Sequence, residues 1–169
     1  MNDPIVLSSP KVDHAQRFLG DCEPFAIVDV ADLVFWIGSI DFQDWPQQSR
    51  TELRPAMVND LRWHDFGAMT DGVVGELLRH FPGCGAYQRM LSVVMPGHSI
   101  EPHKDWQGPD WVCRVHVPLT SNDQSKFIVG GVAHRLAIGT AYMVNTEAEH
   151  SVTNGGAMPR VHFMFDVQG

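Results

Sequence analysis

The sequence predicts a mainly β fold, a barrel or jelly roll, with helices from its N-terminal part packed on one outer face. From Tyr87 onward the chain is a series of short apolar segments of strand length, and turn residues separate them. Helical spacing is confined to residues before about 86. Many short strands at regular spacing are typical of barrels and jelly rolls. A chain of 169 residues is long enough to bury one core, so we expect a single domain over residues 1–169.

The expected elements follow from apolar periodicity and turn residues. Helices are expected near residues 11–19 and 71–81, the second capped by Thr70 or Asp71 and ended by Pro82 and Gly83. The expected strands are Phe25–Val30, Tyr87–Met95, Trp111–Thr120, Lys126–Val129, Val132–Ala137, Ala141–Asn145 and Arg160–Val167. The turns between the later strands are expected at Pro96–Gly97, Ser121–Asp123, Gly130–Gly131, Gly139 and Asn154–Gly156.

Composition excludes several functional classes. A net charge of -8 argues against a nucleic-acid partner, because phosphate binding requires a basic surface. The three cysteines, Cys22, Cys84 and Cys113, contain no CxxC pair, so neither a zinc ribbon nor a disulfide framework is expected. There is no secretory signal pattern and no apolar run of the roughly 20 residues that a membrane span needs. We therefore expect a cytoplasmic protein with a small-molecule partner and no membrane association, and the sequence leaves its oligomeric state open.

Two of the expected strands carry an unusual polar face. Side chains alternate between the two faces of a strand, so Arg114 and His116 share one face, and Arg160 and His162 share one face of the last strand. A half-solvated amphipathic strand is one explanation. A solvent face, however, usually carries Thr, Lys, Glu and Ser, whereas Arg paired with His inside a small barrel would form a pocket for an anion.

A metal site is suggested by the His-x-Asp pair of His103 and Asp105. On an extended segment these side chains project from the same face, so one cation can bind both. Two histidines and a carboxylate suit Fe(II) and leave three coordination positions open. His150 is the best candidate for the third ligand, because it lies between two expected strands, whereas Glu149 faces the opposite way. A chance His-x-Asp pair and an exposed loop histidine remain the alternatives.

Arg160 is the candidate anion anchor. It lies ten positions after His150, which on a barrel corresponds to the end of one strand and the start of the next antiparallel strand. That arrangement would place Arg160 within a cavity's depth of the metal, where a five-carbon diacid could bridge the two. The alternative is a surface arginine at a strand entry marked by Pro159.

Four sequence blocks lie in the β-rich part of the chain: LSVVMPGHSIEPHKD (Leu91–Asp105), CRVHVPL (Cys113–Leu119), EHSVTN (Glu149–Asn154) and RVHFMFDV (Arg160–Val167). Together, and in this order over roughly residues 87–167, they resemble the aspartyl/asparaginyl β-hydroxylase family of 2-oxoglutarate oxygenases. The resemblance implies a double-stranded β-helix, a jelly-roll or cupin-like fold. It also implies Fe(II) as cofactor, 2-oxoglutarate and O2 as co-substrates, and succinate and CO2 as co-products.

The resemblance assigns roles to individual residues. His103 and His150 match the iron-binding histidines of the family, and Arg160 matches the arginine that pairs with the distal carboxylate of 2-oxoglutarate. The co-substrate pocket is implied to include Arg114 and His116, which match an Arg-x-His pair, and Ser92, which matches a serine that hydrogen-bonds 2-oxoglutarate.

Asp105 refines the comparison with the family. Vertebrate members that modify epidermal growth factor-like domains have glycine at this position, so this chain is more similar to bacterial members that act on small molecules, such as free proline hydroxylases. The carboxylate also argues against a halogenase. We therefore expect hydroxylation of an aliphatic C–H on a free amino acid or an amino-acid-derived small molecule. Trp106, His98, Lys104 and Arg62 are equally well explained by packing or solvation, so the sequence assigns no substrate-binding residue.

Other functional classes stay open at this point. A cupin-type metal dioxygenase or isomerase would use the same His and Asp ligands without 2-oxoglutarate, and hydroxylation of a peptide or protein would leave the cofactors unchanged. A non-catalytic binding module would keep the barrel and an anion pocket. Turnover that ignores 2-oxoglutarate would favour the cupin-type enzyme, and the lack of any Fe(II) affinity would favour the binding module.

Overall fold

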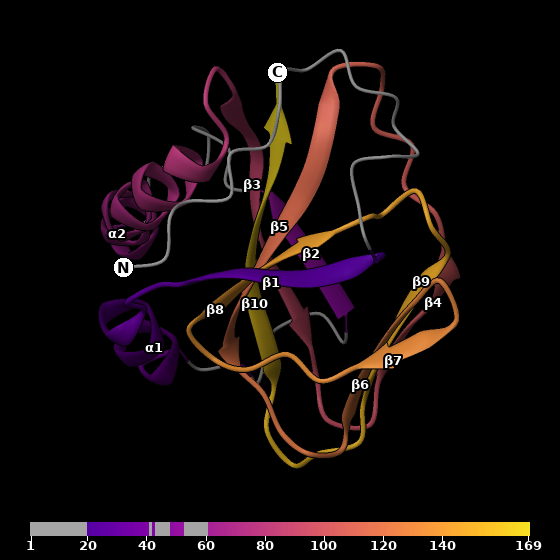
Figure 1. The fold of residues 1–169 in the computed structure, drawn as a ribbon. Helices are drawn as coiled ribbons and strands as arrows, with labels where there is room; N and C mark the ends of the chain where they lie inside the picture. Colours follow the sequence, from indigo (N-terminus) through magenta and orange to yellow (C-terminus); the bar gives the residue numbers. More distant parts are fainter. Residues whose placement is uncertain (1–19, 41, 43–47, 53–60) are drawn as a thin grey trace.

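The computed structural model describes residues 20–40, 42, 48–52 and 61–169, and in these residues ten strands form two antiparallel sheets (Figure 1). The larger sheet has six strands in the order β1-β8-β5-β10-β3-β2. These are β1 (Cys22–Ile27), β8 (Thr140–Val144), β5 (Trp111–Thr120), β10 (Arg160–Gln168), β3 (Gly85–Val94) and β2 (Gln48–Glu52). The smaller sheet has four, β4 (Ser99–His103), β9 (His150–Asn154), β6 (Ser125–Val129) and β7 (Val132–His134).

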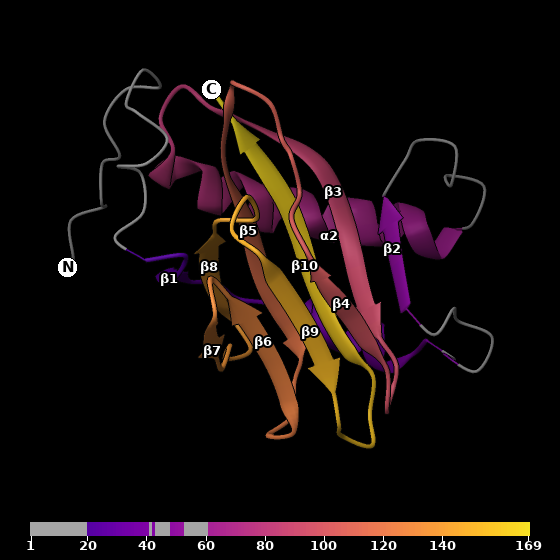
Figure 2. The same cartoon turned by 90° about the vertical axis from the view of Figure 1, so that its right-hand side faces the viewer.

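The two sheets face each other and enclose an inner cluster of side chains. Val94, Tyr142 and Val144 of the larger sheet pack with Phe127 and Val152 of the smaller one. Figure 2 shows β4, β9 and β6 lying across the face of the larger sheet. From β3 onward the chain alternates between the sheets. It passes from β3 in the larger sheet to β4 in the smaller one, back to β5, on to β6 and β7, back to β8, on to β9, and finally back to β10. The fold is therefore the double-stranded β-helix that the sequence predicts.

The helices cover the outer face of the larger sheet (Figure 1). Helix α1 (Ala31–Gly38) and helix α2 (Leu61–Leu77), followed by a short 3-10 helix at Leu78–His80, bury Leu33 and Leu77 against that face. The sheet contributes alternate residues of its central strands, including Val115 and Phe163, which are fully buried. Strand alternation thus directs the apolar side chains to the helices and leaves the other face for polar groups.

Helix boundaries were predicted less well than helix packing. The helix predicted over 71–81 begins at Leu61, and Thr70 does not cap it, because its hydroxyl donates to the Gly67 carbonyl inside the helix. Thr70 and Asp71, as possible N-cap residues, favoured a later start, but the helix continues through both. Helix α1 was not predicted, since it is only eight residues long. The helix expected near 11–19 lies outside the described residues.

Strand predictions fail where strands are polar or end early. The segment predicted as Phe25–Val30 pairs instead over Cys22–Ile27, and the one predicted as Val132–Ala137 ends at His134. Strands β4 and β9 were not predicted because few of their residues are apolar. Asn154 is the last residue of β9 rather than a turn residue, and its side-chain amide donates to the Val94 carbonyl of the larger sheet.

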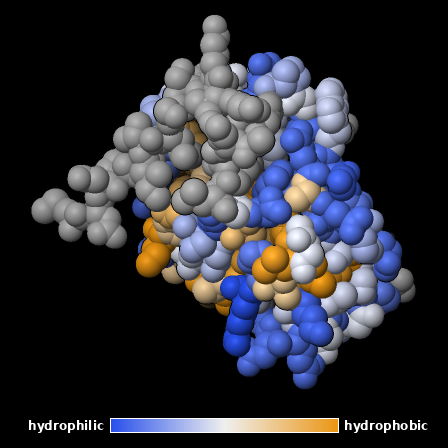
Figure 3. All heavy atoms as spheres, turned by 45° about the vertical axis from the view of Figure 1, so that its right-hand side comes forward, coloured by the Kyte–Doolittle hydropathy of each residue, from blue (hydrophilic) through white to orange (hydrophobic). Residues whose placement is uncertain are grey.

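The surface in Figure 3 mixes hydrophilic residues with smaller hydrophobic patches. Single exposed apolar side chains such as Ile27, Phe35 and Trp106 are ordinary for a folded domain. Within the described part of the chain, none of the helices combines the length and the apolar character that crossing a membrane requires.

Candidate metal centre and co-substrate pocket

Two histidines face each other across the smaller sheet. His103 ends β4 and His150 begins β9, and the antiparallel register places them directly opposite one another. Their ring centroids are 4.2 Å apart. The carboxylate of Asp105 completes the cluster, with Oδ1 3.9 Å from His103 Nε2 and Oδ2 3.9 Å from His150 Nε2. The three ligand atoms lie within 4.8 Å of one another, so a single cation can contact all three.

The hydrogen bonds of the two imidazoles set their tautomers. His103 Nδ1 lies 2.7 Å from the Glu101 carbonyl, and His150 Nδ1 lies 3.0 Å from the Ala148 carbonyl. A carbonyl oxygen only accepts hydrogen bonds, so Nδ1 is the donor in each ring. In the neutral imidazoles Nε2 then carries the lone pair, and it points toward the shared centre. Both rings are therefore oriented as metal ligands by carbonyls two residues before them, that of Glu101 within β4 and that of Ala148 just before β9.

Asp105 is held differently, because it lies beyond the end of β4. Its backbone N–H donates to the Thr146 carbonyl at 2.9 Å, in the connection between β8 and β9. Its side chain accepts a hydrogen bond from Arg114 Nη1 at 2.5 Å, across the gap between the sheets. The carboxylate therefore reaches the histidines from a loop that is anchored at both its backbone and its side chain.

This donor set fits a divalent transition metal. Imidazole nitrogens and a carboxylate oxygen suit Fe(II), and three protein ligands leave the remaining positions of an octahedron open. Burial differs among the ligands, since the side chain of His103 is 32% exposed while that of His150 is 4% exposed. Access to the centre is therefore from the His103 side.

The polar face predicted for β5 and β10 lies inside the protein. Arg114, His116, Arg160 and His162 are all buried, so the half-solvated explanation is wrong for both strands. This face of the larger sheet is directed toward the smaller sheet. Charged groups in such a place require partners or a ligand.

A pocket opens between the sheets at the histidines. The larger sheet lines it with Ser92, Arg114, His116, Arg160 and Met164. The smaller sheet lines it with Ile100, His103, Phe127, His150 and Val152. Two of the three candidate metal ligands, His103 and His150, thus share one pocket with the candidate anion anchor.

Arg160 lacks a carboxylate partner among the residues that the structure describes. Its Nη2 donates to His162 Nδ1 at 3.1 Å, and its guanidinium carbon lies 5.6 Å from the ring centroid of Phe127. Burial lowers the pKa of Arg160 to about 9. A buried cation with this surrounding is stabilised by an anion from outside the chain.

His162 offers a second group to such an anion. Because Arg160 donates to its Nδ1, the neutral ring carries its proton on Nε2. Burial, together with the positive charge of Arg160 and a further electrostatic contribution from His116, lowers the pKa of His162 well below its ordinary value, so the ring is neutral at pH 7. Its Nε2 is buried and has no hydrogen-bond partner among the described residues. An unsatisfied donor beside an uncompensated guanidinium fits a carboxylate ligand.

Arg114, in contrast, has its charge compensated inside the protein. Nε and Nη2 donate to the two oxygens of Asp166 at 2.9 and 2.8 Å, and Nη1 donates to Asp105. Burial disfavours the charged guanidinium, but the hydrogen bonds and charges of Asp166 and Asp105 outweigh it and raise the pKa of Arg114. Arg114 lines the pocket as predicted, while its donors are directed to these carboxylates.

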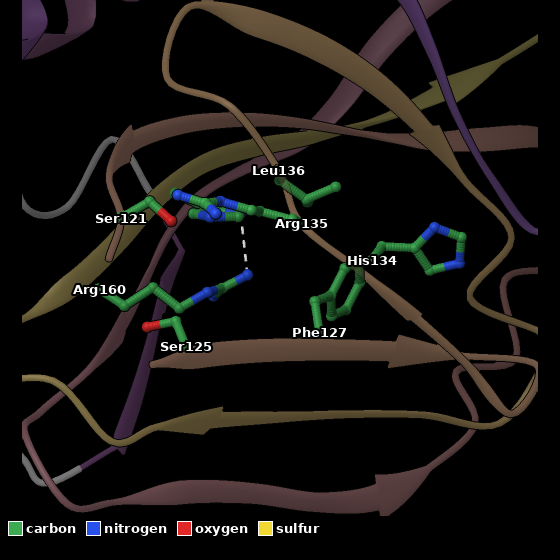
Figure 4. Close-up of a pocket in the computed structure, with 8 residues that line it drawn as sticks. Ser121, Ser125, Phe127, His134, Arg135, Leu136 and Arg160 are labelled. Carbon is green, nitrogen blue, oxygen red and sulfur yellow. Dashed lines mark hydrogen bonds between the residues drawn. The ribbon is translucent and has the colours of Figure 1, made fainter. Parts of the chain in front are cut away.

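A second hollow adjoins the first at Arg160 and Phe127, which line both. Figure 4 shows Arg160 with Ser121, Ser125 and Arg135 around it. The guanidinium of Arg160 therefore separates the metal pocket from a second space bordered by the loop after β5 and the residues after β7.

Comparison with known proteins bears on this geometry. The family model described as aspartyl/asparaginyl beta-hydroxylase matches residues 68–169, which contain every residue of the candidate centre. This chain belongs to that family. The match covers strands β3 to β10 and the second half of α2, whereas β1, α1 and β2 lie before it. No curated protein matches the chain.

Solved structures share the fold at low sequence identity. AviO1 from Streptomyces viridochromogenes is 11% identical with a TM-score of 0.67, covering 95% of this chain and 97% of that one. A prolyl-4-hydroxylase from Pseudomonas putida is 14% identical with a TM-score of 0.54, covering 89% and 93%. An oxidoreductase of the 2OG-Fe(II) oxygenase family from Burkholderia pseudomallei is 19% identical with a TM-score of 0.46, covering 54% of this chain and 49% of that one. This chain thus spans about half of the Burkholderia protein.

Membership in the aspartyl/asparaginyl β-hydroxylase family makes the chain an oxygenase of the hydroxylase type. The structure brings together every site residue predicted from the sequence, with His103, Asp105 and His150 at one end of the site and Arg160 and Ser92 on the opposite wall of the pocket. One topological expectation is wrong. His150 begins β9 in the smaller sheet and Arg160 begins β10 in the larger one, so the two face each other across the pocket rather than along neighbouring strands.

Sequence reasoning missed Asp166, Thr146 and Phe127. Asp166 was detectable, because strand alternation places it on the same face as Arg160 and His162, and a carboxylate is out of place in an apolar strand. Thr146 acts through its backbone carbonyl and leaves no such signal. Phe127 stacks on His116 with 5.2 Å between ring centroids, a contact that depends on how the two sheets pack.

We expect His150→Ala to weaken Co(II) binding at least a hundredfold, because the change removes the most buried imidazole of the cluster. Isothermal titration calorimetry measures the loss directly. His98→Ala is the control, since His98 lies in a turn outside the cluster and should leave the affinity unchanged. Equal affinities for wild type and His150→Ala would place the metal elsewhere.

Proposed function

We propose that the protein is an Fe(II)- and 2-oxoglutarate-dependent hydroxylase of an aliphatic C–H, acting on a free amino acid or an amino-acid-derived small molecule. One observation carries the proposal. His103 and His150 line the same pocket as the uncompensated Arg160, and Asp105 lies close to both histidines, so a cation and a dicarboxylate can bind side by side.

The wall of the larger sheet supplies the groups for the co-substrate. The distal carboxylate of 2-oxoglutarate would bind Arg160, with the hydroxyl of Ser92, which lines the same pocket, as a further donor. His162, the cross-strand partner of Ser92 in the register of β3 and β10, borders the second hollow and accepts a hydrogen bond from Arg160. His116 is placed to support the near end, because Arg114 already donates to Asp105 and Asp166.

Iron held by His103, Asp105 and His150 would supply O2 activation, with one oxygen atom entering the substrate and the other entering succinate as CO2 leaves. The chain itself contributes position and exclusion of water. His150 and Arg160 are buried, so the charged ends of the co-substrate leave bulk water when they bind. The exposed edge of His103 leaves the approach for the substrate open.

A small substrate is supported by Asp105. Asp105 is a carboxylate where family members that act on protein domains have glycine. Nucleic acid is not a proposed partner, because the net charge is -8. The cytoplasm is the proposed location, because the three cysteines form no disulfide.

Arg160→Gln should weaken 2-oxoglutarate binding by about 2–5 kcal/mol, because it removes the buried partner of the distal carboxylate. The measurement is anaerobic titration of the Fe(II)-loaded protein with 2-oxoglutarate, followed by the visible metal-to-ligand charge-transfer band. In wild type the affinity should also fall as the pH rises above about 9, where Arg160 loses its proton.

Arg135→Gln is the matched control for this titration. Arg135 borders the second hollow, but its side chain is 77% exposed and pairs with Asp123. It should leave 2-oxoglutarate affinity unchanged. If Arg160→Gln lost less than a few-fold affinity, Arg160 would not be the anchor, and turnover independent of 2-oxoglutarate would favour a cupin-type enzyme.

The substrate class is tested by succinate release from 2-oxoglutarate in the presence of candidate substrates. Free amino acids and their small derivatives should stimulate succinate formation above the uncoupled rate, and mass spectrometry should find the stimulating compound heavier by one oxygen atom. Stimulation by Asp- or Asn-containing peptides, with none by free amino acids, would transfer the proposal to peptide or protein hydroxylation.

A further inference from the structure

We propose that Asp166 is a positioning residue that fixes the metal-binding carboxylate Asp105 through the guanidinium of Arg114. The proposal rests on the proposed metal site, and it concerns residues on the opposite sheet from the two histidines. It assigns a role to a buried aspartate that is neither a metal ligand nor a pocket-lining residue.

The contacts form a continuous chain of hydrogen bonds. Asp166 accepts two parallel bonds from Arg114, at 2.9 Å on Oδ1 and 2.8 Å on Oδ2. The indole N–H of Trp111 donates to the same Oδ1 at 3.2 Å. The remaining terminal nitrogen of Arg114, Nη1, donates to Asp105 Oδ2 at 2.5 Å. A two-point pair fixes the guanidinium plane, so the direction of its third donor is also fixed.

The backbone register holds these hydrogen-bonded residues in place. Asp166 on β10 and Arg114 on β5 are direct cross-strand partners at the centre of the larger sheet. Asp166, Arg114 and Trp111 are each about 1% exposed. An ion pair so deeply buried is not screened by solvent, and removing one member leaves the other unpaired.

Asp105 needs an external restraint more than the histidines do. Each histidine is oriented by a carbonyl two residues before it in the chain. Asp105 lies in a loop, and its carboxylate accepts a hydrogen bond from Arg114 of the larger sheet. Because Arg114 binds one carboxylate oxygen, it favours a carboxylate that binds the cation through its other oxygen. Groups that orient metal ligands in this way strongly affect metal affinity.

The charges of the assembled site are consistent with this role. Two guanidinium groups, Arg114 and Arg160, and one divalent cation would balance Asp105, Asp166 and a dianionic co-substrate. Asp166 therefore compensates Arg114 and leaves Asp105 available to the metal. Without Asp166, Asp105 would be the remaining carboxylate partner of Arg114 among the described residues. The guanidinium would then compete with the cation for the Asp105 carboxylate.

The test measures Co(II) affinity and the visible Co(II) spectrum of folded variants. Asp166→Asn keeps the shape of the side chain and removes its charge, and it should weaken Co(II) binding about 10–100-fold. The spectrum should change as well, because the carboxylate ligand is no longer held in place. Asp123→Asn is the matched control: Asp123 also pairs with an arginine, but both side chains are more than three quarters exposed, so Co(II) affinity should stay within twofold.

Two further variants separate positioning from a purely structural role. In an Asp105→Ala background, Asp166→Asn should have no further effect on Co(II) affinity, because its effect acts through Asp105. Arg114→Lys keeps a buried cation for Asp166 but loses the fork, so it should reproduce the loss of affinity even if Asp166→Asn does not fold.

The outcomes are distinguishable. Wild-type affinity in folded Asp166→Asn, or in Arg114→Lys if Asp166→Asn does not fold, would overturn the positioning role and leave the proposed function intact. Equal losses with and without Asp105 would also overturn it, because they would show a general structural effect. Failure of the wild-type protein to bind Co(II) would instead contradict the metal site on which the proposed function depends.

Discussion

The structure depends on compensating the charges that the larger sheet buries on its inner face. Arg114 and Arg160 are both almost fully enclosed between the two sheets. Burying a cation without a partner costs several kcal/mol, so each must be balanced. The chain balances Arg114 with Asp166 and Asp105, and it provides no carboxylate for Arg160 among the described residues. The inner face therefore has two parts. Around Arg114 it supports a candidate metal ligand, and around Arg160 it can bind an anion.

The two sheets supply different halves of the site. Antiparallel pairing of β4 with β9 places His103 opposite His150, and local carbonyls turn both Nε2 atoms toward one centre. The larger sheet packs against the helices on its outer face, and its inner face supplies the arginines and His116. The pocket lies at the junction of the two sheets, so a ligand that bridged the cation and Arg160 would contact both.

The sequence alone predicted the β architecture and the site residues because both follow from strand alternation and short motifs. Alternation placed Arg160 and His162 on one face, and the position of His150 between two expected strands, together with the family resemblance, made it the candidate for the distant ligand. The sequence did not predict that both faces of β10 are buried, because a pattern of alternating polarity is compatible with either a solvated face or a polar cavity. The polar strands β4 and β9 were missed because few of their residues are apolar, and the contact of Asn154 with the larger sheet depends on how the two sheets pack.

A crystal structure of the anaerobic complex with Mn(II) and 2-oxoglutarate tests the central claim most directly. The account predicts one cation on His103 Nε2, His150 Nε2 and a single oxygen of Asp105, with 2-oxoglutarate extending from that cation to the guanidinium of Arg160. A cation bound away from these three side chains, or a diacid that does not reach Arg160, would contradict it.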